Sequence, residues 1–412
     1  MFSTLINAFK IKETRTRLLY MLLVLFIFRI GTHLPVPGLD LSKVGEMGNS
    51  SLYQMIAGGN YGTVFAMGIG PYINASIIMQ LLTVAIPKLE QINKEGEEGR
   101  RKINQYTRVA AVILSLLQGC GQVYTVHTAF IHQNFFVYIM ALVTMVTGTI
   151  FVMWMGEKLT EVGIGNGASF LIFANILSGL ASGVAALYTV GATNGAAGWV
   201  KVAAIIAVLL VVMVFVIFIQ DGERRIPVQY SKKMVGRRYI GGQSSYIPIK
   251  VNIAGVMSII FAISLLQFPY TINQLFHIPA LETVARYLST SHPVGAVLYV
   301  ILIFCFTFFY TGFAFNPVEV AENIKKSGGF VPGIRPGKPT SDYIQNVVDR
   351  ISLIGACAYA FIALVPILLE KIFNINVSFG GTTLLIVTGV ALEIVKQLEA
   401  QMLMRHYKGF LS

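Results

Sequence analysis

A cationic segment near the C-terminal third carries the residues best suited to electrostatic contact with another molecule. Lys325–Gly337 contains two lysines, one arginine, four glycines and two prolines. Glycine and proline interrupt regular elements, so we expect no helix or strand here. Pro332 and Pro336 fix the backbone φ on both sides of Arg335 and hold it on an exposed tip. The segment therefore predicts a stiff contact site for a binding partner.

Patterns that would indicate catalysis or metal binding are missing from the sequence. It contains no HExxH, Walker A, GxSxG or paired-carboxylate pattern, and its six histidines are scattered. Cys120, Cys305 and Cys357 fall in apolar segments without metal-ligand spacing, and we interpret them as small buried apolar residues. We expect no enzyme, no cofactor and no metal site.

The composition predicts a protein that crosses a membrane many times. Of its 412 residues, 55% are hydrophobic and 12% are charged, whereas soluble domains carry about 25% charged residues. A span must be helical unless it faces protein or water, and it must cross about 30 Å of hydrocarbon. Ten segments suit this role: 17–34, 65–87, 108–130, 135–155, 168–189, 200–219, 251–269, 294–316, 351–369 and 377–395.

The net charge of +12 could indicate nucleic-acid binding, but the positions of the cations in the sequence fit membrane topology better. Nearly all cations lie in the N-terminus and in alternate loops, 88–107, 220–250 and 317–350, while the opposite loops hold few. This positive-inside pattern places both termini in the cytoplasm. The first apolar run leads into Gly31–Gly38 rather than a cleavage site, so we expect it to be retained.

Five predicted spans precede the loop at 190–199 and five follow it, which predicts two halves, 1–189 and 190–412. Related halves with an odd number of spans have opposite orientations. The run Glu95–Lys102 has mixed charges and is interpreted as a solvated loop. The glycine-rich run Gly163–Gly167 follows no strand, so a tight membrane turn is favoured over a phosphate site.

Polar residues are scarce within the predicted spans. Their interiors lack Asp, Glu and Lys, which weighs against an ion-coupled secondary transporter with inverted repeats, the main alternative function. In the second span, Ile69 and Ile73 share a helix face, and Asn74 and Gln80 need polar partners. Ordinary helix packing explains these residues, and so does a gate with an apolar collar that closes a pore by dewetting.

Seven motifs in order resemble the SecY/Sec61-alpha family, the channel subunits of the general protein-secretion translocon, over essentially the whole chain. They are Phe28–Gly31 with Pro35–Gly38, Gly70–Ser76, Glu95–Lys102, Gly163–Gly167, Pro248–Asn252, Asn316-Pro317 leading into Lys325–Gly337, and Phe379–Thr382.

The resemblance implies an all-α integral membrane protein with ten transmembrane helices, in two inverted five-helix halves that form a clamshell around a central pore with a plug. The implied pore ring is Ile69, Ile73, Ala168, Ile172, Ile260 and Ile386. Ala168 departs from the usual bulky residue, and Ser258 stands where proline is common. The implied plug lies near 52–62, with Leu52, Tyr53, Met55, Ile56, Gly58 and Gly59. From composition alone, this external stretch could equally be a surface helix. Implied lateral-gate residues are Gln80, Gln118 and Asn252.

The function implied by the resemblance is a passive channel in the bacterial cytoplasmic membrane. Such a channel translocates unfolded, signal-sequence-bearing preproteins and releases apolar segments sideways into lipid. The implied partners are SecE and SecG in a heterotrimer, the SecA motor and the ribosome, with no small-molecule substrate. Motor or ribosome contacts are expected at Arg237, Arg238, Lys325, Lys326 and Arg335. A membrane scaffold or insertase accessory that shares the fold is a further alternative.

Overall fold

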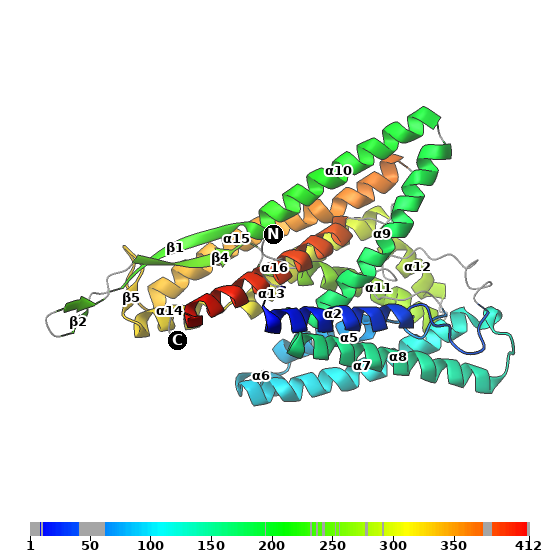
Figure 1. Ribbon diagram of the computed structural model, residues 1–412, viewed down its shortest axis with the longest axis horizontal. Coiled ribbons are helices and arrows are strands. Elements are labelled where there is room, and N and C mark those ends of the chain that lie inside the picture. Colours follow the sequence, from blue (N-terminus) through cyan, green and yellow to red (C-terminus); the bar gives the residue numbers. More distant parts are fainter. Residues whose placement is uncertain are drawn as a thin grey trace. The chain divides into compact units, whose positions relative to one another are not determined.

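A computed structural model describes most of the chain (Figure 1). The described residues are 9, 11–40, 62–193, 195–230, 233–235, 238–240, 244–251, 253–254, 256–276, 279–290, 292–373 and 381–409. The predicted plug, Arg237 and Asn252 lie outside these ranges.

The chain divides into two compact units. Unit 1 comprises Met1–Val190, Ser264–Ser289 and Val390–Ser412, and unit 2 comprises Gly191–Ile263 and Thr290–Gly389. The division into halves at residue 189 stays a prediction. The C-terminal parts of the predicted seventh and tenth spans group with unit 1.

Helices dominate both units. Those that begin in unit 1 are α2 (Lys12–Gly31), α5 (Gly70–Ala85), α6 (Pro87–Lys94), α7 (Glu97–Thr125), η1 (His127–Ala129), α8 (Phe135–Val162), α9 (Gly167–Thr193) and α12 (Pro279–Leu288). Unit 2 contains α10 (Gly195–Asp221), α13 (Pro293–Ala314), α14 (Pro317–Lys326) and α15 (Lys338–Phe373). Both α11 (Met257–Phe276) and α16 (Gly381–Gly409) begin in unit 2 and continue into unit 1.

The helices match a multi-pass membrane protein. Five stretches are long and apolar enough to cross a bilayer, namely α8, α9, α10, α15 and Pro293–Lys326, which contains α13. The pair α5 and α6 also qualifies, but it is bent by 100°. By contrast, α2 has five charged residues near its ends, and they shorten its uncharged apolar stretch. They are Lys12, Glu13, Arg15, Arg17 and Arg29.

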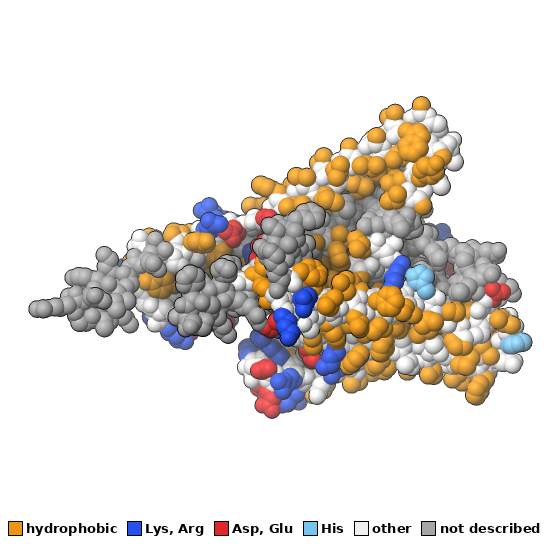
Figure 2. Space-filling view, in the orientation of Figure 1, with side chains coloured by type: hydrophobic (Ala, Val, Ile, Leu, Met, Phe, Trp, Pro, Cys, Tyr) orange, Lys and Arg blue, Asp and Glu red, His pale blue; other side chains and the backbone are white. Residues whose placement is uncertain are grey.

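The outward-facing side chains of α10 are strongly apolar. Val211, Val214 and Phe218 are 68%, 66% and 74% exposed, and hydrophobic side chains cover this helix in Figure 2. Such a surface requires a hydrocarbon environment, because a soluble protein rarely exposes so large an apolar area. Cys120, Cys305 and Cys357 are also exposed. Their interpretation as buried residues is therefore wrong: they face outward from their helices.

Unit 2 contains a small sheet that the sequence analysis missed. Three strands have the order β4-β1-β5, with β1 at Glu223–Tyr230, β4 at Ser244–Lys250 and β5 at Gly329–Phe330. All the pairings are antiparallel, and β2 (Lys233–Val235) pairs with β3 (Arg238–Ile240) as a separate hairpin. The alternation of Ile226, Val228 and Tyr230 was the available signal for β1.

The sheet packs on α14 and α15 around one apolar core. This core contains Ile226, Val228, Ile249, Ile324, Val331, Ile344, Val348 and Ile351. Residues 223–230 and 244–250 of one predicted loop and 317–350 of the other therefore form a single folded body, which we call the strand lobe.

Three boundaries differ from the sequence prediction. The second span does not begin at residue 65, because α5 starts at Gly70 after a turn in which Gly68 has φ +51°. The predicted solvated loop Glu95–Lys102 is mostly helix, because only Glu95 and Gly96 separate α6 from α7. Lys325–Gly337 does contain regular structure, because the extended backbone of β5 adds to the edge of β1.

Candidate functional site

Ile69 and Ala168, two predicted ring positions of unit 1, meet at a glycine of α8. A Cβ atom added to Gly156 would lie 3.3 Å from Ile69 Cδ1 and 3.8 Å from the Cα of Ala168. The missing side chain therefore lets the start of α5 and the start of α9 approach the same point on α8. Ile73 follows Ile69 by one helical turn, and Ile172 follows Ala168 by the same spacing.

The turn between α8 and α9 fixes the position of Ala168. The Asn166 side-chain oxygen accepts from the backbone N–H of Ala168 at 3.0 Å and caps the start of α9. The Gly167 N–H donates to Thr160 Oγ1 at 2.9 Å, and Gly165 adopts φ +87°. The predicted tight turn at Gly163–Gly167 is confirmed.

The two ring positions of unit 2 lie beside a second glycine contact. A Cβ atom on Gly389 of α16 would lie 2.8 Å from Val256 Cγ2 and 2.8 Å from Gln220 Nε2. Ile386 precedes Gly389 by three residues, and Ile260 follows Val256 by four. The seventh and tenth predicted spans cross in opposite directions, so this contact places Ile386 and Ile260 at similar depths.

Most ring candidates are deeply buried. Ile69, Ile172, Ile260 and Ile386 are only 2%, 3%, 3% and 1% exposed, while Ile73 and Ala168 are partly buried. All six side chains are aliphatic, so they can exclude water but cannot bind an ion.

One predicted gate residue, Gln80, carries an incompletely satisfied amide. Gln80 Nε2 donates to Ser76 Oγ at 3.4 Å, and Gln80 Oε1 is buried without a hydrogen-bond partner among the described residues. Gln118 is partly buried. Gln220 was not predicted as a site residue. It is 7% exposed, and its two amide atoms have no partner in the described part of the chain.

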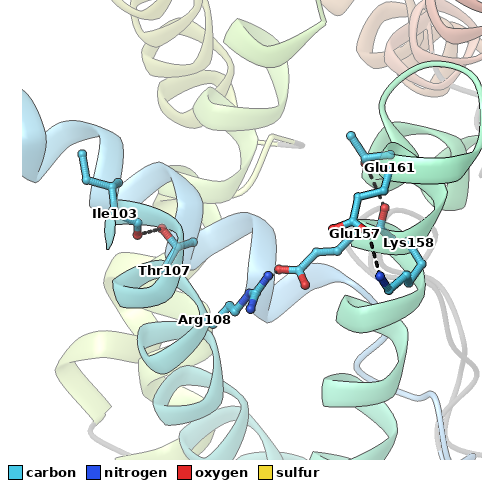
Figure 3. Close-up of polar contacts among 8 residues, drawn as sticks. Ile103, Thr107, Arg108, Glu157, Lys158 and Glu161 are labelled. Carbon is cyan, nitrogen blue, oxygen red and sulfur yellow. Dashed lines mark hydrogen bonds and ion pairs between the residues drawn. The ribbon is translucent and has the colours of Figure 1, made fainter. Parts of the chain in front are cut away.

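An interhelical ion pair was also missed. Arg108 Nε of α7 donates to Glu157 Oε1 of α8 at 2.7 Å, and the two side chains point toward each other in Figure 3. Lys158 Nζ and Glu161 Oε2 form a separate pair within α8 at 2.6 Å. The spacing of 49 residues between Arg108 and Glu157 gives no local sequence signal for this contact.

The strand lobe displays the predicted partner-binding cations. Lys325, Lys326 and Arg335 are exposed, and the Arg335 carbonyl accepts from Thr340 Oγ1 at 2.8 Å, which fixes the backbone at the tip. Lys326 pairs with Glu322 at 3.6 Å. The side chains of Arg237 and Arg238 lie outside the described part of the chain.

One further cation of the lobe is held in a fixed orientation. On β1, Arg225 pairs with Glu223 at 2.6 Å and stacks over Tyr246, with 4.8 Å between the guanidinium carbon and the ring centroid. Its hydrogen bond to Glu223 raises the pKa of Arg225, so this group stays charged.

The residues that flank the stretch 41–61 are joined to each other. The Val36 N–H donates to the Gly62 carbonyl at 2.8 Å, and the Val64 N–H donates to the Leu34 carbonyl at 2.9 Å. These bonds form a bridge between Pro35 and Thr63. The stretch containing the predicted plug thus leaves and returns at one point.

Comparisons with known proteins agree with this architecture. A family profile described as SecY matches residues 63–395. The protein translocase subunit SecY of Streptomyces galbus is 43% identical over the full length of both chains. The SecY subunit of Thermus thermophilus is 40% identical over 98% of this chain and 97% of its own length.

Solved structures share the fold at lower sequence identity. A structure titled as that of a protein conducting channel matches with a TM-score of 0.71 at 20% identity, covering 93% of this chain and 91% of the other. Sec61 in the canine ribosome-channel complex matches with a TM-score of 0.68 at 18% identity, covering 93% and 91%. With the full-length likeness to the translocase subunits, these matches lead to one conclusion: the chain belongs to the SecY family.

Proposed function

We propose that this chain is the protein-conducting channel of a bacterial cytoplasmic membrane, with both termini in the cytoplasm. The observation that carries the proposal is the contact of Ile69 and Ala168 with Gly156 in unit 1. In unit 2, Ile260 and Ile386 lie within four residues along the chain of the contact between Val256 and Gly389. A ring without charged or polar groups can fit loosely around an extended polypeptide and block ions by dewetting when the pore is empty.

The incompletely hydrogen-bonded amide of Gln80 supports a lateral gate, through which apolar segments leave the pore for the lipid. A signal sequence with an apolar run can replace helix–helix contacts at the gate, because the lipid tails and the helix surfaces are similarly apolar. Its insertion shifts a closed–open equilibrium only by its preference for the open state. In this proposal Gln80, Gln118 and Asn252 line the gate, and Leu52–Gly59 blocks the resting pore.

The exposed cations of the strand lobe support the docking of a partner that supplies the energy for translocation. We assign the strand lobe the docking of the SecA motor or the ribosome, through Lys325, Lys326, Arg335, Arg237 and Arg238. Exposed cations attract the phosphates of ribosomal RNA or acidic protein surfaces. The channel itself hydrolyses nothing in this proposal, and SecE and SecG complete the complex.

Reconstitution tests the proposal directly. The chain, purified with its small co-purifying subunits, is placed in proteoliposomes with SecA, ATP and a secretory precursor. We expect protease-protected precursor, and only when the signal sequence is intact. A precursor that stays fully accessible to protease under these conditions would contradict the channel function.

A further inference from the structure

The Arg108–Glu157 ion pair joins α7 and α8, and the channel proposal gives the pair itself no role. The Arg108 side chain on α7 is 49% exposed, whereas the Glu157 side chain on α8 is only 20% exposed. Other pairs, such as Arg17–Glu13 and Arg101–Glu97, lie within a single helix. A contact between helices, unlike those, can set how one helix is placed against another.

The pair is the last layer of a packed three-helix contact. Ala75 of α5, Ala111 of α7 and Met153 of α8 form a buried cluster. Arg108 precedes Ala111 by three residues and Glu157 follows Met153 by four, so the ion pair lies one turn beyond this cluster. Small alanine side chains permit helices to slide, whereas a charge-assisted hydrogen bond is directional and fixes one register.

Glu157 directly follows the glycine on which the ring candidates rest. Gly156 contacts Ile69 and Ala168, with 3.3 Å and 3.8 Å from its added Cβ position. Adjacent residues on a helix project about 100° apart. Any rotation of α8 that breaks the bond to Arg108 therefore also turns Gly156 away from those two residues.

A third helix is coupled to the same charges. Tyr72 of α5 packs on the Ala75 cluster and lies within electrostatic range of both Glu157 and Arg108. It stands between Ile69 and Ile73 in the sequence. The ion pair thus borders α5, which carries Ile73, and lies beside the α8 glycine that contacts Ile69 and Ala168.

We propose that Arg108 and Glu157 are positioning residues that hold α8 in the rotation that seats the pore ring. This inference rests on the proposed channel function and adds a determinant of how tightly the resting pore is sealed. The effect is modest, because a partly exposed ion pair changes an equilibrium by at most about fivefold.

The test is the resting ion permeability of proteoliposomes that contain the complex without precursor. We expect Arg108→Gln and Glu157→Gln each to raise ion flux about two- to fivefold. The double neutral variant should leak no more than either single variant, because both remove the same bond. Arg108→Lys, and the charge swap Arg108→Glu with Glu157→Arg, should restore the seal in large part.

Two further measurements separate positioning from general destabilisation. The matched control is Lys158→Gln with Glu161→Gln, which removes a pair on the same turn of α8 that stays within that helix, and its flux should equal that of the wild type. In native membranes, a disulfide between cysteines at Ile69 and Ala168 should form less readily with Glu157→Gln than without it.

Wild-type flux in both single variants would overturn the inference, as would equal leakage in the Lys158/Glu161 control or a swap that does not restore the seal. Precursor translocation by the wild-type complex in the same vesicles separates the two claims. If translocation succeeds and the leak pattern fails, only the positioning role is lost. If the wild type itself does not translocate, the channel proposal fails first.

Discussion

At the scale of single residues, the candidate pore depends on glycines, at which a side chain would collide with a neighbouring helix. A Cβ atom on Gly167 would lie 2.1 Å from the backbone oxygen of Gly156 and 2.5 Å from Leu159 Cβ. Backbone cannot yield as a side-chain tip can, so α9 would have to move as a whole. The residue that follows Gly167 is Ala168, a ring candidate.

Gly167→Ala should therefore lower the thermal stability of the complex and raise its resting ion flux. We expect a loss of about 1–3 kcal/mol, as for other overpacked sites. The matched control is Gly312→Ala in α13, where an added Cβ meets nothing within 4 Å. That change should leave the midpoint of thermal unfolding unchanged or raise it, because alanine has a higher helix propensity than glycine. Equal midpoints for the two variants would contradict the close-packing argument.

At the scale of elements, the strand lobe joins segments from two loops that are far apart in the sequence. Gln229 pairs with Phe330 and Tyr230 with Gly329, so β5 ties the segment after α14 to the sheet that follows α10. The alternating apolar residues that indicate this sheet form short runs, and charged residues interrupt them. Glycines and prolines suggested an irregular loop, but the extended backbone of Gly329 and Phe330 still pairs at the edge of β1.

Gly329→Val should detach β5 from the sheet. An added Cβ would lie 2.8 Å from Tyr230 Cε1 and 3.1 Å from Ile324 Cγ2, so a valine cannot fit without displacing both. We expect faster chymotryptic cleavage after Phe330, because the segment loses its pairing with β1. Ser327→Val, at an exposed position two residues earlier, serves as the control and should be cut at the wild-type rate. Unchanged cleavage of both variants would show that β5 does not hold the tip.

Arg335→Glu should reduce SecA-driven translocation severalfold while the protein still inserts into the membrane. The side chain is exposed, so the change removes a surface charge and leaves the apolar core of the lobe intact. Translocation should be less impaired in Arg335→Lys, which keeps the positive charge. Normal translocation by the glutamate variant would rule out a coupling role for this tip.

At the scale of the whole molecule, the family resemblance implies a ring of six residues, of which four belong to unit 1 and two to unit 2. Single cysteines at Ile73 and Ile260 should both crosslink to a precursor stalled during translocation, because both positions belong to the proposed ring. A cysteine at Phe218 of α10, where the native side chain is 74% exposed, should instead react with lipid-phase reagents. Crosslinks from Phe218 but from neither ring position would contradict the pore assignment.

The sequence predicted the membrane class, the family and the tight turn at Gly163–Gly167, because apolar runs and glycine spacing are local signals. It did not predict the Arg108–Glu157 pair or the contact of Gly389 with Gln220, because these depend on how distant helices pack. The cysteines were misplaced for a related reason. In a membrane protein an apolar residue can face lipid or protein, and composition does not distinguish the two.

The bridge between Pro35 and Thr63 bears on how this protein can change over evolution. Because the chain leaves and returns at one hydrogen-bonded point, residues can be added or removed between them without shifting the helices on either side. Loop-closure entropy grows only slowly with length. Related chains can therefore change the length of this insert outside the proposed plug, Leu52–Gly59, without moving the bridge that holds its two ends.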